Sequence, residues 1–123
     1  MVSWKDAVVA PSATIQSAIE RLDSSRCQIV LVVEDGKLIG TITDGDVRRA
    51  LLRRTPLDES VLTVMNADPR TVPTGTSRAA IMVLMHEYKV RQMPTIDRDG
   101  RVVDLFLLDD LVVPSGQDAW VVI

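Results

Sequence analysis

The sequence predicts an α+β fold made of two copies of one β-α-β-β-α unit, packed sheet to sheet with pseudo-twofold symmetry. Three observations support this prediction. Each half of the chain contains an amphipathic helix pattern, each helix is followed by two strand patterns joined at an Asp-Gly turn, and each second strand leads into an acidic helix start. A unit of this size rarely closes a core alone, so we expect the two copies to pack together with a cleft where they meet.

The helix pattern places apolar residues at positions i, i+3, i+4 and i+7, which is the spacing of one face of an α-helix. These residues are Ile15, Ala18, Ile19 and Leu22 in the first half, and Ile81, Leu84, Met85 and Tyr88 in the second. Ser12 and Thr14 stand just before the first pattern and are candidate N-caps. We therefore expect one amphipathic helix near the start of each copy.

Two strand patterns follow each of these helices. The strands are expected at 29–33 and 38–42 in the first half, and at 93–96 and 102–107 in the second. Asp35-Gly36 and Asp99-Gly100 predict the turns between them, because glycine tolerates positive φ. Two further helices are expected, one from Asp46 to before Pro56 and one from Asp109 to before Pro114.

The spacing of the two copies is expected to change upstream of the hairpin. Gly36 and Gly100 are 64 positions apart, and so are Asp46 and Asp110. Ala18 matches Ala80 in the helix pattern, however, and these residues are 62 positions apart. We therefore expect the second copy to carry two extra residues between its helix and its first strand.

The composition restricts the classes of function. The chain has 123 residues, enough to bury a core without disulfides or metals, and its net charge of −3 argues against nucleic-acid binding. No apolar run approaches the roughly 20 residues that span a bilayer, and the N-terminus lacks a signal-peptide pattern. Cys27 is the only cysteine, which predicts a cytoplasmic protein. The lack of a catalytic constellation or metal-ligand cluster predicts that this chain is not itself an enzyme.

Several motifs together resemble one known family. Residues 40–46 read Gly-Thr-Ile-Thr-Asp-Gly-Asp, residues 90–97 read Val-Arg-Gln-Met-Pro-Thr-Ile-Asp, and residues 60–65 read Ser-Val-Leu-Thr-Val-Met. With the Asp-Gly hairpins, these motifs resemble the cystathionine-β-synthase-type repeat, or CBS domain, which usually occurs in pairs. The resemblance covers about residues 8–114.

A narrower resemblance concerns the protein to which the pair belongs. Residues 42–52 are similar to CBS pairs fused in front of sugar-phosphate nucleotidyltransferases, and residues 120–123 resemble the start of that enzyme domain. The expected boundaries are a first repeat at 1–55, a linker at 56–68, a second repeat at 69–114, and a linker leading into a truncated downstream domain at 115–123.

The residues of the closing turn suit a nucleotide. Gly40 would let a ligand approach the backbone closely, and Asp46 stands at a helix start, where the helix dipole favours a carboxylate. A carboxylate accepts hydrogen bonds from ribose hydroxyls, and the resemblance gives Asp46 this role and gives Thr43 a phosphate contact. It also implies contacts from the second repeat, with Arg91 facing phosphate and Val72 and Met93 forming apolar walls. The full second-repeat set is Thr71, Val72, Val90, Arg91, Met93 and Pro94.

A pseudo-equivalent second site is expected to be degenerate. Its aspartate persists as Asp110, but Leu107 replaces the hydroxyl residue of the turn and Asp104 replaces the glycine. By the same resemblance its remaining residues would be Val9, Ala10, Cys27 and Gln28, with no cation at position 27 to bind phosphate.

Each of these signals also has a plainer interpretation. Thr43 and Asp46 also fit a simple helix N-cap with an acid in the first turn, and Arg91 also fits an ordinary surface arginine. The remaining candidates are expected to be structural: a solvated face of Arg48, Arg49, Arg53 and Arg54, core residues Met82, Met85 and Met93, an uninvolved His86 and a packed Cys27. Asp44 and Asp46 lack the other ligands of a calcium loop.

The resemblance implies a regulatory module for an adenosyl-type ligand, namely AMP, ADP, ATP or S-adenosylmethionine, with no required cofactor and no metal. It further implies a homodimer formed through the CBS pairs and control of an attached catalytic domain, without membrane contact. The alternative is a structural module that dimerises and positions the downstream domain without any ligand.

Overall fold

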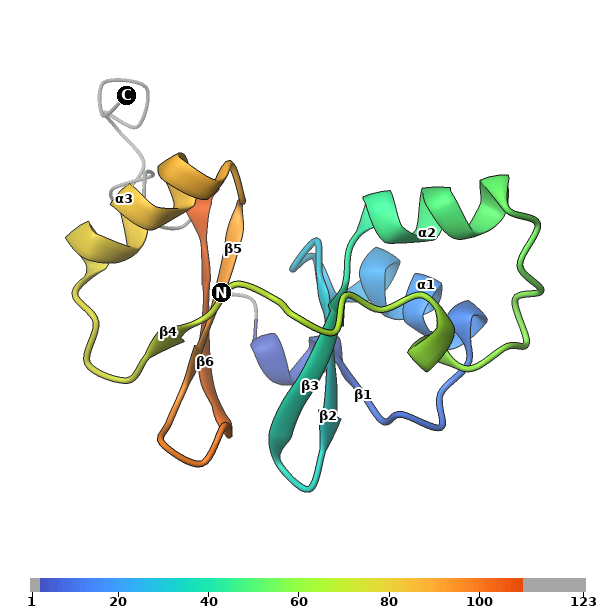
Figure 1. Cartoon of the computed structure of the whole chain (residues 1–123), viewed down its shortest axis with the longest axis horizontal. Helices are drawn as coiled ribbons and strands as arrows, with labels where there is room; N and C mark the ends of the chain where they lie inside the picture. Colours follow the sequence, from blue (N-terminus) through green and yellow to red (C-terminus); the bar gives the residue numbers. More distant parts are fainter. Residues whose placement is uncertain (1–2, 110–123) are drawn as a thin grey trace. The chain divides into compact units, whose positions relative to one another are not determined.

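The protein was analysed as a computed structural model that describes residues 3–109 (Figure 1). The chain divides into two compact units, unit 1 up to Pro69 and unit 2 from Arg70. Each unit contains one three-stranded sheet with helices, and the strands and helices follow the expected β-α-β-β order. The prediction of a mixed α+β fold with two copies of one unit is therefore confirmed.

Unit 1 contains a three-stranded sheet in the order β1-β2-β3. Strand β1 pairs parallel with β2, and β2 pairs antiparallel with β3. Its elements are η1 (Trp4–Ala7), β1 (Val8–Val9), α1 (Ile15–Ser25), β2 (Val30–Glu34), β3 (Lys37–Ile42), α2 (Asp44–Leu52) and η2 (Val61–Thr63).

Unit 2 repeats the topology with sheet order β4-β5-β6, again one parallel and one antiparallel pairing. Its elements are β4 (Val72–Pro73), α3 (Arg78–Tyr88), β5 (Gln92–Ile96) and β6 (Val102–Leu107). Residues 108–109 are helical, where the last helix is expected to start. The rest of that helix, the degenerate-site residue Asp110 and the predicted downstream segment 115–123 lie outside the described residues.

The two long helices begin and end by the same local chemistry. The hydroxyl of Thr14 accepts a hydrogen bond from the backbone N–H of Ser17 at 3.1 Å, and Ser77 accepts one from Ala80 at 3.1 Å. These N-caps satisfy N–H groups that have no partner within the helix. At the other end, Arg26 and Lys89 take left-handed conformations that stop α1 and α3.

The two hairpins differ by one loop residue. Asp35 and Gly36 both have positive φ, 54° and 81°, which is the signature of a two-residue type I′ turn. The second hairpin has a three-residue loop, in which Gly100 takes φ 83° and the backbone N–H of Asp97 donates to Arg101 at 2.9 Å. The second loop is therefore the longer one.

The expected spacing between the copies is wrong upstream of the hairpin. The N-caps Thr14 and Ser77 are 63 positions apart. The same interval relates Val9, paired with Val32, to Val72, paired with Thr95. The single extra residue lies in the hairpin loop, so Ala18 corresponds to the equally buried Ile81 and not to the exposed Ala80. The sequence match failed because one alanine faces the core and the other faces solvent.

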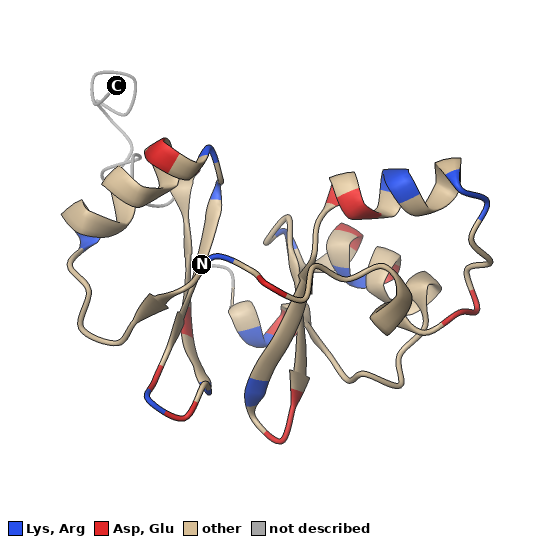
Figure 2. Cartoon of the chain, in the orientation of Figure 1, with Lys and Arg blue, Asp and Glu red and all other residues tan. Residues whose placement is uncertain are grey.

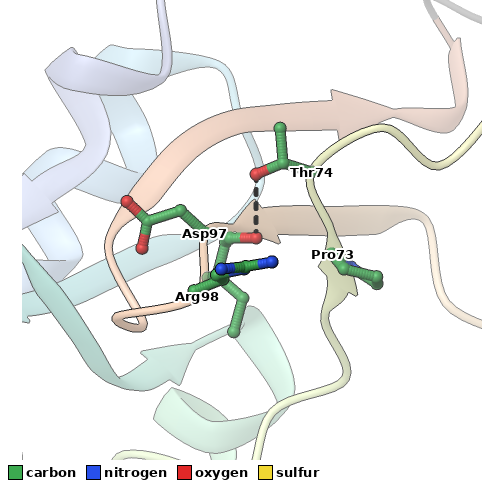
Figure 3. Close-up of a pocket in the computed structure, with 5 residues that line it drawn as sticks. Pro73, Thr74, Asp97 and Arg98 are labelled. Atoms are coloured by element: carbon green, nitrogen blue, oxygen red, sulfur yellow. Dashed lines mark hydrogen bonds between the residues drawn. The ribbon is translucent and has the colours of Figure 1, made fainter.

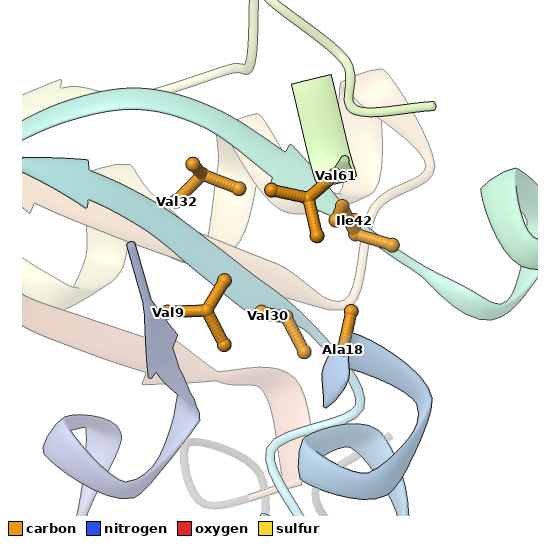
Figure 4. Packing of buried hydrophobic residues seen from close by; sticks show 6 residues of the cluster. All are labelled: Val9, Ala18, Val30, Val32, Ile42 and Val61. Carbon is orange, nitrogen blue, oxygen red and sulfur yellow. The ribbon is translucent and has the colours of Figure 1, made fainter. Parts of the chain in front are cut away.

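Six buried side chains form the core of unit 1 (Figure 4): Val9, Ala18, Val30, Val32, Ile42 and Val61. They come from all three strands, from α1 and from η2. Full burial of one aliphatic side chain stabilises a fold by roughly 1.5–3 kcal/mol, so Val61 contributes substantially although it lies in a segment predicted as a linker.

This predicted linker packs against unit 1. The backbone N–H of Val61 donates to Ala13 at 2.9 Å, and residues Thr41 and Asn66 exchange two backbone hydrogen bonds of 3.0 and 2.8 Å. The glycine at position 40 makes this approach possible. A Cβ there would lie 2.4 Å from Sδ of Met65 and 3.0 Å from the carbonyl oxygen of Asn66.

The core of unit 2 contains Val72, Ile81, Met85 and Met93, with Phe106 packed against it. Thr95, whose position corresponds to that of Val32, is buried, and its hydroxyl has no hydrogen-bond partner. A buried hydroxyl without a hydrogen-bond partner is destabilising. At this position unit 2 therefore leaves one polar group unpaired, whereas unit 1 has the apolar Val32.

Helix α2 begins at Asp44, two residues before the predicted start, because Thr43 is the N-cap residue. It ends at Leu52, and its side chains Leu51 and Leu52 are 53 % and 76 % exposed. Within residues 3–109, no helix has the length and apolar character needed to cross a bilayer.

The contact at Gly40 gives a testable stability prediction. We expect Gly40→Ala to lower the free energy of unfolding by about 1–3 kcal/mol, because its Cβ would overlap Met65 and the Asn66 carbonyl. Urea denaturation measures this. Gly45→Ala is the matched control, since its Cβ would meet only ordinary contacts of 3.4 Å or more in a helix, and stability should stay level or rise by up to about 1 kcal/mol. An unchanged midpoint for Gly40→Ala would contradict the packing argument.

Candidate functional site

The turn at residues 40–46 connects β3 to the N-terminus of α2 in unit 1. The Oδ2 atom of Asp46 accepts hydrogen bonds from the backbone N–H of Thr43 at 2.9 Å and from its hydroxyl at 3.2 Å. The Asp46 side chain is only 13 % exposed. Asp46 therefore reaches back to the N-cap residue Thr43, and these bonds hold one carboxylate in a fixed position at a helix N-terminus.

The second carboxylate oxygen of Asp46 also has a partner. Arg49, one helical turn further along α2, places a guanidinium nitrogen 2.6 Å from Oδ1. The same guanidinium lies over Gly45, where a Cβ would be 3.4 Å from it. Figure 2 shows this acidic first turn of α2 followed by a basic stretch. A carboxylate has about four acceptor positions, so acceptor capacity remains after these three contacts.

The expected ligand approach at Gly40 is limited by the chain itself. Gly40 is buried in β3, and the side on which a Cβ would stand is filled by Met65. The absence of a side chain at this position is therefore explained by packing of the segment after η2. Met65 could not be identified as this neighbour from local sequence patterns, because the contact joins residues 25 positions apart.

The second-repeat candidates all lie in unit 2, and most of them are structural. Val72 and Met93 are buried in its core, so their side chains pack against α3 and do not form free apolar walls. Pro94 is fully buried, whereas Thr71 and Val90 are half-buried. Met85 and Met93 are core residues, as predicted.

Arg91 is the exposed cation of this set. Its guanidinium lies 2.6 Å from a carboxylate oxygen of Asp109, and both side chains are more than half exposed. The backbone N–H of Leu108 also donates to the carbonyl of Arg91 at 2.8 Å. Asp109 was not predicted as a partner of Arg91, although its place beside Asp110 at an expected helix start was a usable signal.

The residues proposed for the degenerate site are described only in part. Val9 lies in the core of unit 1, Ala10 and Gln28 are exposed, and Cys27 is buried. The 63-residue interval makes Gln28, and not Cys27, the counterpart of Arg91. It likewise makes Val8 and Val9 the counterparts of Thr71 and Val72, which replaces the expected pair Val9 and Ala10.

Other charged residues lie at the surface. Arg48, Arg53, Arg54 and His86 are exposed, as the solvated-face interpretation predicts. Arg70 stacks over the ring of Tyr88 at 4.1 Å, which accounts for the exposed apolar position at the end of α3. Among the described residues, no group of three or more metal-binding side chains comes together.

A surface cavity of about 420 Å³ lies in unit 2, beside the ends of β4 and β5 (Figure 3). It is lined by Pro73, Thr74, Ile96, Asp97 and Arg98. The hydroxyl of Thr74 donates to the Ile96 carbonyl at 3.1 Å, and the Asp97 carboxylate accepts two backbone N–H groups of its own loop. Its lining does not include any of the predicted site residues.

The sequence is similar to part of several curated proteins. The arabinose 5-phosphate isomerase KdsD of Pseudomonas aeruginosa is 33 % identical over 88 residues, 68 % of this chain and 26 % of that protein. The chain spans about a quarter to a third of the length of such curated relatives.

Two solved structures share the fold. CBSX2 in complex with AMP has 25 % identity and a TM-score of 0.75, covering 91 % of this chain and 89 % of that one. The CBS domain protein PAE2072 from Pyrobaculum aerophilum, complexed with AMP, has 17 % identity and a TM-score of 0.79, covering 94 % and 93 %.

The family model for the CBS domain matches the sequence twice, at residues 2–53 and 60–113. The first match covers the elements of unit 1 up to α2, and the second covers those of unit 2. Because the two matches together account for most of the chain, this protein belongs to the CBS domain family.

Proposed function

We propose that this chain is a regulatory module that binds an adenine nucleotide or a related adenosyl ligand. The observation that carries the proposal is the Asp46 carboxylate, largely buried and held by Thr43 at the N-terminus of α2. The similarity to CBSX2, solved with AMP, supports the same ligand class.

The proposed contacts of unit 1 lie at the end of β3 and the start of α2. Ribose hydroxyls donate to Asp46, while the N-terminal N–H groups of α2 face phosphate, and the hydroxyl of Thr43 donates to phosphate in exchange for its bond to Asp46. Separately, we propose Arg91 of unit 2 as a phosphate contact in which its guanidinium exchanges Asp109 for phosphate, since both partners of that pair are exposed. Because Val72 and Met93 are core residues, we propose that they contact the base through their backbone.

We propose one competent site and one degenerate site. In unit 2, Leu107 stands at the position of Thr43, so the turn lacks the hydroxyl, and Asp104 stands at the position of Gly40. The counterpart of Arg91 is Gln28, which is uncharged. Asp110 alone keeps the acidic position of the motif.

Nucleotide binding is tested by thermal shift and isothermal titration with AMP, ADP, ATP and S-adenosylmethionine. At about 100 times its dissociation constant, a ligand should add about 2.7 kcal/mol of stability. Asp46→Asn should weaken binding at least about tenfold, because hydrogen bonds to a charged acceptor are worth about 1.5–3 kcal/mol. Asp44→Asn, an equal charge change at an exposed residue of the same turn, is the control. No shift with any compound at millimolar concentration would refute the proposal.

A second candidate function is dimerisation without a ligand. Two observations favour it. Both oxygens of Asp46 already have partners within the chain, and large apolar side chains are exposed on two helices, Leu51 and Leu52 on α2 and Val83 on α3. We propose that these helices contribute to a homodimer, with or without the nucleotide.

The dimer proposal is tested by light scattering coupled to size-exclusion chromatography. We expect the wild-type chain to elute as a dimer and Leu52→Glu to shift it toward monomer, since a charge at the centre of an apolar contact is strongly unfavourable. Leu62→Glu, at an exposed leucine of η2, serves as the control and should leave the dimer intact. A monomeric wild-type chain at micromolar concentration would be the contrary result.

We further propose that the module controls an attached cytoplasmic enzyme that acts on a phosphorylated sugar. The resemblance of residues 42–52 favours a nucleotidyltransferase, whereas the similarity to KdsD raises an isomerase as the alternative.

The complete parent protein distinguishes these two enzymes. It should be assayed for pyrophosphate release from a nucleoside triphosphate with a sugar 1-phosphate, and for arabinose 5-phosphate isomerisation, each with and without AMP or ATP. We expect one activity, and we expect its rate or KM to change with the nucleotide. Neither activity, or an activity insensitive to every nucleotide, would count against control by this module.

A further inference from the structure

We propose that Arg49 sets the charge preference of the site, so that phosphorylated ligands bind in preference to the uncharged nucleoside. The inference rests on the proposed nucleotide site and names a residue that the sequence analysis assigned to a solvated surface. Arg49 is then a positioning residue for Asp46 and a source of positive charge beside the ligand.

The geometry of Arg49 differs from that of a free surface arginine. Its guanidinium lies 2.6 Å from Oδ1 of Asp46 and beside Gly45, 3.4 Å from where a Cβ of that residue would stand. Because Thr43 holds Oδ2 of the same carboxylate, Asp46 is fixed from both sides. Arg49 itself is 57 % exposed, so part of its guanidinium remains available to a ligand.

The charges explain why this contact matters for an anionic ligand. The first turn of α2 carries two carboxylates, Asp44 and Asp46, and a nucleotide that hydrogen-bonds Asp46 through its ribose brings its phosphate within one sugar length of that carboxylate. Like charges at such a distance repel each other, because salt largely screens charge interactions only beyond about 8 Å at physiological ionic strength. The guanidinium of Arg49 offsets the charge of Asp46 and offers donors suited to phosphate.

The neighbouring Arg48 provides a matched comparison. It lies on the same helix, carries the same charge and is exposed, but among the described residues it forms no ion pair. Any effect of net charge alone should therefore appear equally at Arg48, whereas an effect of the Asp46 contact should appear only at Arg49.

The experiment measures dissociation constants of adenosine, AMP and ATP by isothermal titration at about 50 mM and about 300 mM salt. In the wild-type chain, the dissociation constant of adenosine divided by that of ATP should exceed one. Arg49→Gln should lower this ratio about tenfold at low salt, with a smaller effect at high salt. Arg49→Lys should restore most of the ratio, and Arg48→Gln should leave it within about threefold of the wild-type value.

The outcomes separate this inference from the proposed function. If the wild-type chain binds ATP but Arg49→Gln weakens adenosine and ATP equally, or changes neither, Arg49 is only structural and the inference is overturned while the site stands. If the wild-type chain binds none of the three compounds, the proposed function fails and the inference fails with it. Thermal melting of each variant without ligand confirms that the variants are folded.

Discussion

The carboxylate of Asp46 joins the parts of the candidate site. One oxygen holds the backbone and hydroxyl of Thr43 at the end of β3, and the other holds Arg49 on the next turn of α2. Strand end, helix start and surface cation are thus fixed by one side chain. A ligand that binds here must share this carboxylate with contacts that the folded chain already makes. The net gain on binding is therefore smaller than the new hydrogen bonds alone suggest, because existing ones are shared or exchanged.

The core and the candidate site share the same short strands. Val72 and Met93 pack against α3, while Arg91, which directly precedes β5, reaches solvent. The strand residues therefore serve packing, and the exposed polar groups lie where the strands begin or end. The side chains in the core are then not available to select a ligand. Selection falls to the backbone and to a few exposed polar groups, which agrees with the small number of candidate contacts that remain.

Much of the fold could be predicted because its signals are local. The helix period, the Thr14 cap and the Asp-Gly turns each depend on a few adjacent residues. The sequence-based predictions were wrong where the burial of a side chain determines which residues correspond in the two units. Ala80 resembles Ala18 in sequence, but only the structure shows that Ile81 occupies the buried position. In the candidate site, the Asp46–Arg49 pair has ordinary helical spacing and could have been inferred. The role of Gly40 could not, since it depends on Met65, a residue distant in the chain.

The packing of residues 56–66 on unit 1 has a consequence for how the chain is made. Val61 completes the first core, and Asn66 pairs with Thr41 just before the chain enters unit 2. These contacts therefore lie upstream of unit 2 in the order of synthesis. As the polypeptide leaves the ribosome, they can form once residue 66 has emerged, while unit 2 is still being translated. A nascent chain halted near Thr55 would instead lack Val61, one of the six residues of the unit 1 core.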